Sequence, residues 1–577
     1  MGSKMEHIYK RINTFYSAVG AHPFWCAFLV CVLLTPLCFG ALDNISDGAY
    51  MLVCLCYVAA PCAAVVYIMG RRGISGWRDR LAVLAAAAGL LIAGLALTKA
   101  FRGSEHRIIW IFAGIVLPAL LLRGIALRDR EHSDRHWAFL IMVTSFAIKL
   151  CYVLYTSFYT RQHDVGSFDG EKGHAGYIEY ILKNRGLPDF DPRTRYQYYH
   201  PPLHHTVSAA WIYLCEEVFG VSRNNARESL QMLMLFYSVA SLIVVYKLLR
   251  HFGFKGKALI LPLALFAFHP SYILSSGSIN NDQLSNLLTL VAILLTMRWC
   301  KSPTLRNIIP IALAIGFAMM SKLNAGIVAP AVAVMFLWQL VKHKEELGRF
   351  MKQFCIFGVI VFPLALWWQV KNKLMFHMPF DYVPNIGTEH QYVGDDIIGR
   401  LTDFAPKQFS SVFECFIQYG DAYDEYNPTV AILKNSLFGE YLDTPNFPNG
   451  NVIVPTLLFW LAAVLALLAV VVTVVFLFKK STRLPLYAKV FFGGYWAFAM
   501  YYFYLFCYLY PNTCTQNFRY IQPLMVVGVV QYAMTFDELE GGKETLLKKI
   551  FVRGLTAALA AFGLLSIAVY LLVGRSA

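Results

Sequence analysis

The chain has 577 residues, of which 58% are hydrophobic and only 15% are charged, with a formal net charge of +15. Soluble domains carry about 25% charged residues, so this composition excludes an ordinary soluble protein. It predicts an all-α protein that crosses the membrane many times. No soluble surface combines basic and aromatic residues, so the sequence does not indicate nucleic acid as a partner.

Apolar runs recur along the chain at about the 20-residue length that a helix needs to cross the bilayer. We predict about 15 transmembrane helices on this criterion. They cover residues 24–42, 50–69, 81–98, 107–125, 137–159, 230–249, 257–275, 282–299, 307–321, 323–342, 351–371, 452–478, 486–508, 519–536 and 551–573. We divide the chain into a four-helix N-terminal membrane extension, 1–136, and a membrane core, 137–575.

Short basic clusters set the topology, because Lys and Arg gather in cytoplasmic loops. This rule places two long polar segments, 160–205 and 372–450, on the outer face. The apolar stretch 206–219 is short and contains Glu216 and Glu217, so we predict that it lies at the outer membrane interface. The absence of targeting signals of soluble proteins favours a bacterial plasma membrane, with membrane lipids as the surroundings.

Four ionisable residues from distant segments fall on the same outer side in this topology. Asp164 follows the fifth predicted helix, Asp282 begins the eighth, Lys322 lies in a turn, and Arg519 begins a late helix. Charged groups near the bilayer are costly and usually functional. We therefore predict that these two carboxylates and two cations meet in one site.

This set of groups suits the transfer of a sugar from a lipid phosphate. Lys322 and Arg519 would bind the phosphate, the arginine through two parallel hydrogen bonds. Asp164 would act as the general base that takes the proton from an acceptor hydroxyl. Each residue also has an ordinary interpretation, since an Asp often caps a helix and Lys or Arg often extends to the interface. The prediction depends on all four sharing one side.

The segment "YQYYHPPLHH", 196–205, contains histidines at a spacing that could bind zinc on a helix, His200 and His204. The two prolines between them prevent a regular helix there. We therefore expect Tyr198, His200 and His204 to line a polar groove, and we predict no metal site and no certain cofactor, with a divalent cation left open. The remaining candidate substrate-binding residues are His163, His174, Asn281, Asp282 and Tyr520.

The order of several segments resembles a known family. Asp164 is followed by "GHAGYIEYIL", "YHPPLHH", a predicted interfacial helix and a helix ending "YKLLRHFG". The turn "SKLNAGIVAP" and a late "RYIQP" come next. Residues 137 to 575 resemble the C-fold (GT-C) glycosyltransferases of the protein O-mannosyltransferase and aminoarabinose transferase group.

The resemblance implies a GT-C membrane core with outer loops and an interfacial helix. It also implies inverting transfer from a polyprenyl-phosphate sugar on the extracytoplasmic face, with Asp164 as the base and Lys322 and Arg519 on the lipid phosphate. Many relatives carry an acidic pair where this chain has His163 before a single carboxylate. The acceptor, a glycan, lipid or protein, would be recognised by loops, chiefly 372–450.

Two other classes of function are consistent with many spans and an anion site. A transporter or flippase of lipid-linked sugars would require a polar path to the cytoplasm, and the predicted spans hold few charges, Lys149 being one. A polysaccharide polymerase or ligase would rely on outer arginines and a histidine more than on an aspartate in the first loop.

Overall fold

The computed structural model describes residues 13–14, 16–39, 107–125, 132–161, 163–384, 391–413, 426–479, 483–541 and 545–576. The predicted helices 50–69 and 81–98 lie outside these ranges. Within them the chain is helical and forms no strand, apart from an isolated antiparallel bridge between Tyr392 and Asn512. The predicted all-α class is therefore confirmed for the described residues.

Most of the long helices follow the predicted apolar runs, whereas α7, α17 and α18 form within the two segments predicted as polar loops. They are α2 Pro23–Phe39, α5 Arg107–Ile125, α6 Ser133–Tyr155, α7 Gly173–Asn184, α8 Leu203–Glu217, α9 Arg223–Glu228, α10 Leu230–His251, α11 Lys257–Ala267, α12 Pro270–Leu274, α13 Asp282–Lys301, α14 Leu305–Ser321, α15 Ala329–Lys342, α16 Leu347–Phe376, α17 Ile397–Thr402, α18 Pro428–Phe438, α19 Ile453–Phe478, α20 Leu486–Leu509, α21 Met525–Glu540 and α22 Leu546–Ser576. Short 3₁₀ helices include η4 Leu323–Val328, η10 Thr513–Thr515 and η11 Phe518–Leu524.

The described residues contain eight helices that are long and apolar enough to cross a membrane, or up to nine if a bent pair counts as one span. The protein is thus multi-pass, but the predicted number of about 15 is too high for this part of the chain. One reason is length, since α14 has only 17 residues. Another is that two predicted spans contain breaks.

Both breaks have local causes in the sequence. α11 and α12 are bent by 53°, because Pro270 starts α12 and the ring of His269 accepts the Ser271 amide at the helix start. The predicted helix 519–536 begins instead as η11, which contains Pro523 and passes into α21. This irregular segment, rather than a regular helix, carries Arg519.

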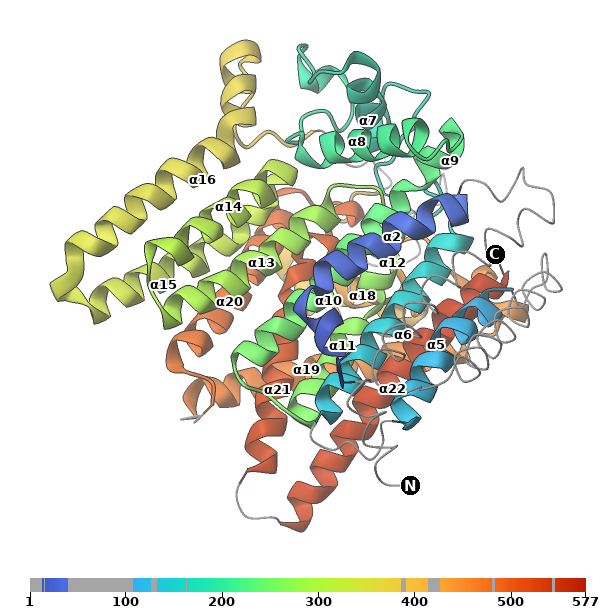
Figure 1. Ribbon diagram of the computed structural model, residues 1–577, viewed down its shortest axis with the longest axis vertical. Helices are drawn as coiled ribbons and strands as arrows, with labels where there is room; N and C mark the ends of the chain where they lie inside the picture. Colours follow the sequence, from blue (N-terminus) through green and yellow to red (C-terminus); the bar gives the residue numbers. More distant parts are fainter. Residues whose placement is uncertain are drawn as a thin grey trace, which may run out of the picture.

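The helices form a bundle in which segments far apart in sequence lie side by side (Figure 1). α13 packs between α10 and α14, and α14 packs against α16. α11 packs against α21 and α22, and the N-terminal helices α2 and α5 pack on α10 and α6. Most of the buried side chains on α10 are apolar, and they belong to the single hydrophobic cluster that fills the bundle interior.

The helices α7, α8 and α9 lie together at one end of the molecule, and the last turn of α21 and the first turn of α22 lie at the opposite end (Figure 1). The predicted interfacial stretch forms α8, which starts only after Pro201 and Pro202, as the two prolines require. Two arginines anchor this end, because Arg223 and Arg227 both pair with the buried carboxylate of Glu179.

Candidate active site

Four ionisable side chains from four separate segments meet in one cluster. Arg519 Nη1 lies 3.0 Å from Asp164 Oδ2 and 3.8 Å from Asp282 Oδ2. Lys322 Nζ lies 2.5 Å from Asp282 Oδ1. The structure thus brings together Asp164, Asp282, Lys322 and Arg519, which the sequence reasoning placed on the same side. The two positive and two negative charges balance.

Asp164 is held by the backbone of loop 160–205, the predicted first outer loop. Its φ of 59° is in the left-handed region, which a non-glycine residue rarely adopts. The Asp164 and Val165 carbonyls accept the amides of His174 and Ala175 at 2.9 and 2.8 Å. These bonds tie the aspartate to the start of α7, and they leave its side chain pointing to Arg519.

Two glycines make this loop closure possible. Gly166 and Gly173 have φ of +65° and +78°, and a Cβ on Gly173 would lie 2.3 Å from the Val165 carbonyl oxygen. The backbone around Gly166 and the backbone around Gly173 therefore lie closer together than a side chain at either position would allow.

Replacing Gly173 with alanine is expected to destabilise the protein by at least about 1–3 kcal/mol, from the backbone conformation alone. The displaced loop should also carry Asp164 away from Arg519 and lower activity. Thermal unfolding in detergent and an activity assay measure both effects. Gly170→Ala is the matched control, because a Cβ there makes only contacts of 3.5 Å or more. Equal effects of the two substitutions would contradict this explanation.

The Asp164 carboxylate accepts two hydrogen bonds, from Tyr196 Oη at 2.5 Å and from Arg519 Nη1 at 3.0 Å. Burial alone would raise the pKa of Asp164, but the Arg519 charge and the Tyr196 hydroxyl outweigh it and hold the pKa below its usual range. Asp164 is therefore ionised while Arg519 stays paired with it.

The Asp282–Lys322 pair is fixed by the ends of two helices. Asp282 is the first residue of α13, and Lys322 follows α14 directly. The Asn281 amide donates to the Ser321 carbonyl at 3.0 Å, and the Ser321 hydroxyl donates to the Asn281 carbonyl at 3.1 Å. Asn281 thus joins the two helix ends that carry the pair and does not contact the cavity described below.

Tyr520 lies between the two cations. Its ring centroid is 5.3 Å from Lys322 Nζ and 5.0 Å from Arg519 Cζ, within the range of cation–π contacts. Arg519 Nη2 also donates to Tyr520 Oη at 3.2 Å. The Tyr520 ring therefore contacts both Lys322 and Arg519 and keeps the two positive groups close together.

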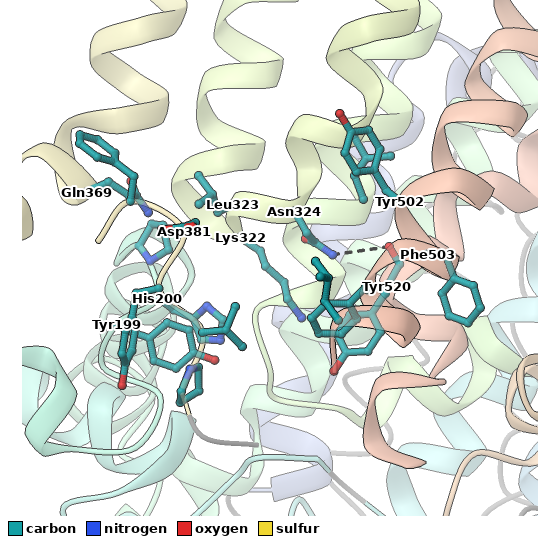
Figure 2. Close-up of a pocket in the computed structure, with 18 of the residues that line it drawn as sticks. Tyr199, His200, Lys322, Leu323, Asn324, Gln369, Asp381, Tyr502, Phe503 and Tyr520 are labelled. Carbon is teal, nitrogen blue, oxygen red and sulfur yellow. Dashed lines mark hydrogen bonds between the residues drawn. The ribbon is translucent and has the colours of Figure 1, made fainter. Parts of the chain in front are cut away.

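A cavity of about 440 Å³ opens beside this cluster. Figure 2 shows Lys322 in its middle, with Tyr199, His200, Gln369 and Asp381 on one side and Phe503 on the other. The wall formed by α20 is apolar, and it includes Phe506 and Leu509. The cavity therefore has a cationic centre, an α20 wall that is mainly apolar or aromatic, and an opposite end where polar side chains stand among apolar ones. Among the predicted residues, Asp164, His200, Lys322, Arg519 and Tyr520 line it.

A smaller cavity of about 70 Å³ lies on the other side of Arg519 and is lined mainly by polar residues. Here His163 Nδ1 lies 3.2 Å from Glu440 Oε2, and the Asn517 amide donates to Glu440. Asp282 and Arg519 also line this cavity. His163 therefore faces Glu440, and not the large cavity that Asp164 lines.

Burial raises the pKa of Glu440 to about 7. Its folded-state pKa lies above the unfolded value, so the protonated carboxyl stabilises the fold below about pH 4.5, and this contribution is lost as pH rises through about 7. Glu440→Gln mimics the protonated form. We expect its melting temperature to exceed that of the wild type increasingly from pH 6 to 8, and equal pH profiles would contradict the raised pKa.

The other predicted histidines form a separate buried group behind the cavity. His174 Nδ1 is 2.9 Å from His205 Nε2, and the His204 ring is 2.8 Å from the Ile279 carbonyl. Tyr198 is fully buried and stacks on Tyr177 instead of lining a groove. Of the three residues expected to line the groove, only His200 reaches the cavity. In the described ranges, no group of three or more His, Cys, Asp or Glu could hold a metal ion.

Sequence reasoning missed several residues of the cluster. Tyr196 bonds Asp164 directly, and Glu440 and Asn517 lie next to Arg519 in the smaller cavity. Tyr196 stands in the quoted "YQYYHPPLHH" segment, so the position of this segment could have suggested it. Nothing in the sequence near Glu440 distinguishes it from the other acidic residues of the second outer loop.

Residues 200–368 match the family model of dolichyl-phosphate-mannose-protein mannosyltransferases. Over this segment, the chain is similar to that family. None of the curated proteins matches the chain significantly. The match confirms the resemblance to GT-C enzymes and the expectation of a glycosyltransferase that uses a polyprenyl-phosphate-sugar donor. The matched range contains Asp282 and Lys322, whereas Asp164 and Arg519 lie outside it.

Proposed function

We propose that this protein transfers a hexose from a polyprenyl phosphate to an acceptor hydroxyl, with inversion at the anomeric carbon, on the extracytoplasmic face. The observation that carries the proposal is the cavity, which has two cations at its centre, an aspartate beside them and an apolar wall. An isoprenoid phosphate has the same division into an apolar chain and an anionic head.

Lys322 and Arg519 would bind the phosphate, which then replaces carboxylates as their partner. Arg519 offers two nitrogen atoms, Nη1 toward Asp164 and Nη2 toward Tyr520, and a phosphate can accept from both. Lys322 adds a point charge, which Asp282 holds in place until the phosphate binds. The four-residue cluster has no net charge before the donor binds. We therefore expect hydrogen bonds from Lys322 and Arg519, and not a net positive potential, to bind the donor phosphate.

In the proposed step the acceptor oxygen forms a bond to the anomeric carbon while the bond from that carbon to the phosphate oxygen breaks. Asp164 takes the proton of the acceptor hydroxyl, and the polyprenyl phosphate leaves with the bonding electrons. When the phosphate engages Arg519, Asp164 loses its strongest hydrogen-bond partner and becomes a better base. General-base help of this kind contributes about 10²–10⁴ in rate.

The position of the basic clusters supports the proposed face. Arg250 and His251 end α10, and Lys257 begins α11, whereas the first outer loop leads away from the other end of α10 through α9. Positive residues mark cytoplasmic loops. The cluster around Asp164 belongs to the first outer loop, at the end away from these residues.

The test uses the purified protein in nanodiscs with polyprenyl-phosphate mannose and a set of hydroxyl acceptors. Release of polyprenyl phosphate together with a product of inverted anomeric configuration, read by NMR, is the expected result. Retention of configuration would contradict the single-displacement mechanism. If reconstitution in vesicles instead shows labelled donor moving between leaflets with no release, the chain acts as a flippase.

A further inference from the structure

The large cavity has two chemically different ends on either side of Lys322 (Figure 2). One end is formed by the side chains of α20 and is apolar or aromatic, with Phe503, Phe506 and Leu509 among them. The other end, the polar end, is formed by α16, loop 160–205 and the segment after α16. Its polar side chains, Tyr199, His200, Gln369 and Asp381, stand among apolar ones such as Phe380 and Val383.

Gln369 is the most unusual residue of the polar end. It lies on α16, its side chain borders the cavity, and it is only 4% exposed. Its Oε1 is buried and has no hydrogen-bond partner among the described residues. Buried polar atoms are almost always satisfied, and leaving one unsatisfied costs about 1–3 kcal/mol. A ligand in the cavity could satisfy the amide.

The same part of α16 holds a second unsatisfied amide. Asn372 is fully buried, and neither of its side-chain polar atoms has a partner in the described part of the chain. It lies three positions after Gln369, which places both on one face of the helix. Asn372 does not line the cavity itself, so it marks a buried polar patch on α16 next to Gln369, and Gln369 is the amide of this patch that a ligand in the cavity can reach.

The end of α16 is also held firmly in place. Trp368 Nε1 donates to the Tyr199 carbonyl at 3.1 Å, Lys371 Nζ donates to the Pro188 carbonyl at 2.5 Å, and Arg193 donates to the Phe376 carbonyl at 2.8 Å. These three bonds dock α16 on the first outer loop, which also carries Asp164. Gln369 is therefore fixed relative to the proposed base.

We propose that Gln369, with Asp381 beside it, binds hydroxyl groups of the donor's sugar and so determines which sugar is transferred. The inference depends on the function proposed above. A carboxamide can both donate and accept, and a carboxylate accepts, so together they match neighbouring hydroxyls of a hexose. With the phosphate at Lys322 and Arg519 and the isoprenoid along α20, the sugar occupies the remaining polar end.

Two ligands that differ only in the sugar test the proposal, polyprenyl phosphate and polyprenyl-phosphate mannose of equal chain length. Their dissociation constants are measured for the wild type and for Gln369→Ala in nanodiscs without acceptor. Loss of one or two hydrogen bonds should weaken binding of the mannose-bearing ligand about threefold to tenfold. Binding of the bare phosphate should stay unchanged. Asp381→Asn should show a smaller selective loss.

Asn324→Ala is the matched control, because Asn324 is also an amide that lines the cavity, on the side of Tyr520 (Figure 2). It should not discriminate between the two ligands. Gln369→Met keeps the side-chain volume and provides a folded variant if the alanine variant unfolds. An equal loss for both ligands in the Gln369 variants, no loss at all, or the same selective loss in Asn324→Ala would overturn the proposal.

Different results would contradict the proposed function and the proposed role of Gln369. If the wild type neither binds polyprenyl-phosphate mannose nor releases polyprenyl phosphate from it, the proposed function is wrong. If the wild type does both and the Gln369 variants keep the full preference for the mannose-bearing ligand, only the assignment of the sugar end is wrong.

Discussion

Asp164→Asn is expected to lower kcat by about 10²–10⁴-fold, the contribution of a general base, while the donor binds at least as tightly as to the wild type. The asparagine cannot take the acceptor proton. It also no longer competes with the donor phosphate for Arg519, which bonds Asp164 in the absence of ligand. Steady-state release of polyprenyl phosphate gives kcat, and equilibrium binding of the donor gives the affinity.

Asp169→Asn is the control for this substitution, since Asp169 belongs to the same loop and is the next carboxylate along the chain. Its side chain is 79% exposed and pairs with Arg227, away from the cavity. Activity of this variant should stay within about threefold of the wild type, as expected for an exposed ion pair. Full activity of Asp164→Asn, or its loss in Asp169→Asn, would contradict the assignment of the base.

Arg519→Gln is expected to weaken donor binding by at least about thirtyfold. Truncating one partner of a buried, hydrogen-bonded charge pair costs about 2–5 kcal/mol, and about 1.4 kcal/mol corresponds to a factor of ten. The variant loses the charge and the fork that can hold a phosphate at two points. The dissociation constant of polyprenyl phosphate, without any sugar, measures this effect directly.

A comparison of Arg519→Lys with Arg519→Gln separates charge from geometry. The lysine variant should recover part of the affinity, because it keeps the charge but cannot bind in a bidentate manner. Arg161→Gln is the control, since Arg161 is outside the large cavity and bonds Thr156 Oγ1. Unchanged phosphate affinity in Arg519→Gln, with the variant folded by thermal unfolding, would remove Arg519 from the donor site.

The helices could be predicted from the sequence because long apolar runs have few alternatives in a bilayer. The start of α8 after Pro201 and Pro202 also followed from local chemistry. The convergence of Asp164, Asp282, Lys322 and Arg519 was predictable for a related reason. Charges close to the bilayer are costly unless they are used, so four of them from separate segments on one side of a predicted topology stand out.

Other features depend on tertiary contacts that one sequence does not reveal. Glu440 reaches His163 and Asn517 across very different sequence positions, and no local pattern marks it. The number of spans was overestimated because hydropathy does not detect breaks such as η11, where a cap at Asn517 and a proline replace the regular helix. That break is the reason Arg519 can turn toward Asp164.

A cryo-EM structure of the protein with polyprenyl-phosphate mannose bound would show where the donor lies. We expect phosphate oxygens about 3 Å from Lys322 Nζ and the Arg519 guanidinium, with the isoprenoid along α20 and the anomeric carbon facing Asp164. A phosphate bound elsewhere, with the Arg519–Asp164 and Lys322–Asp282 pairs unchanged, would contradict this expectation.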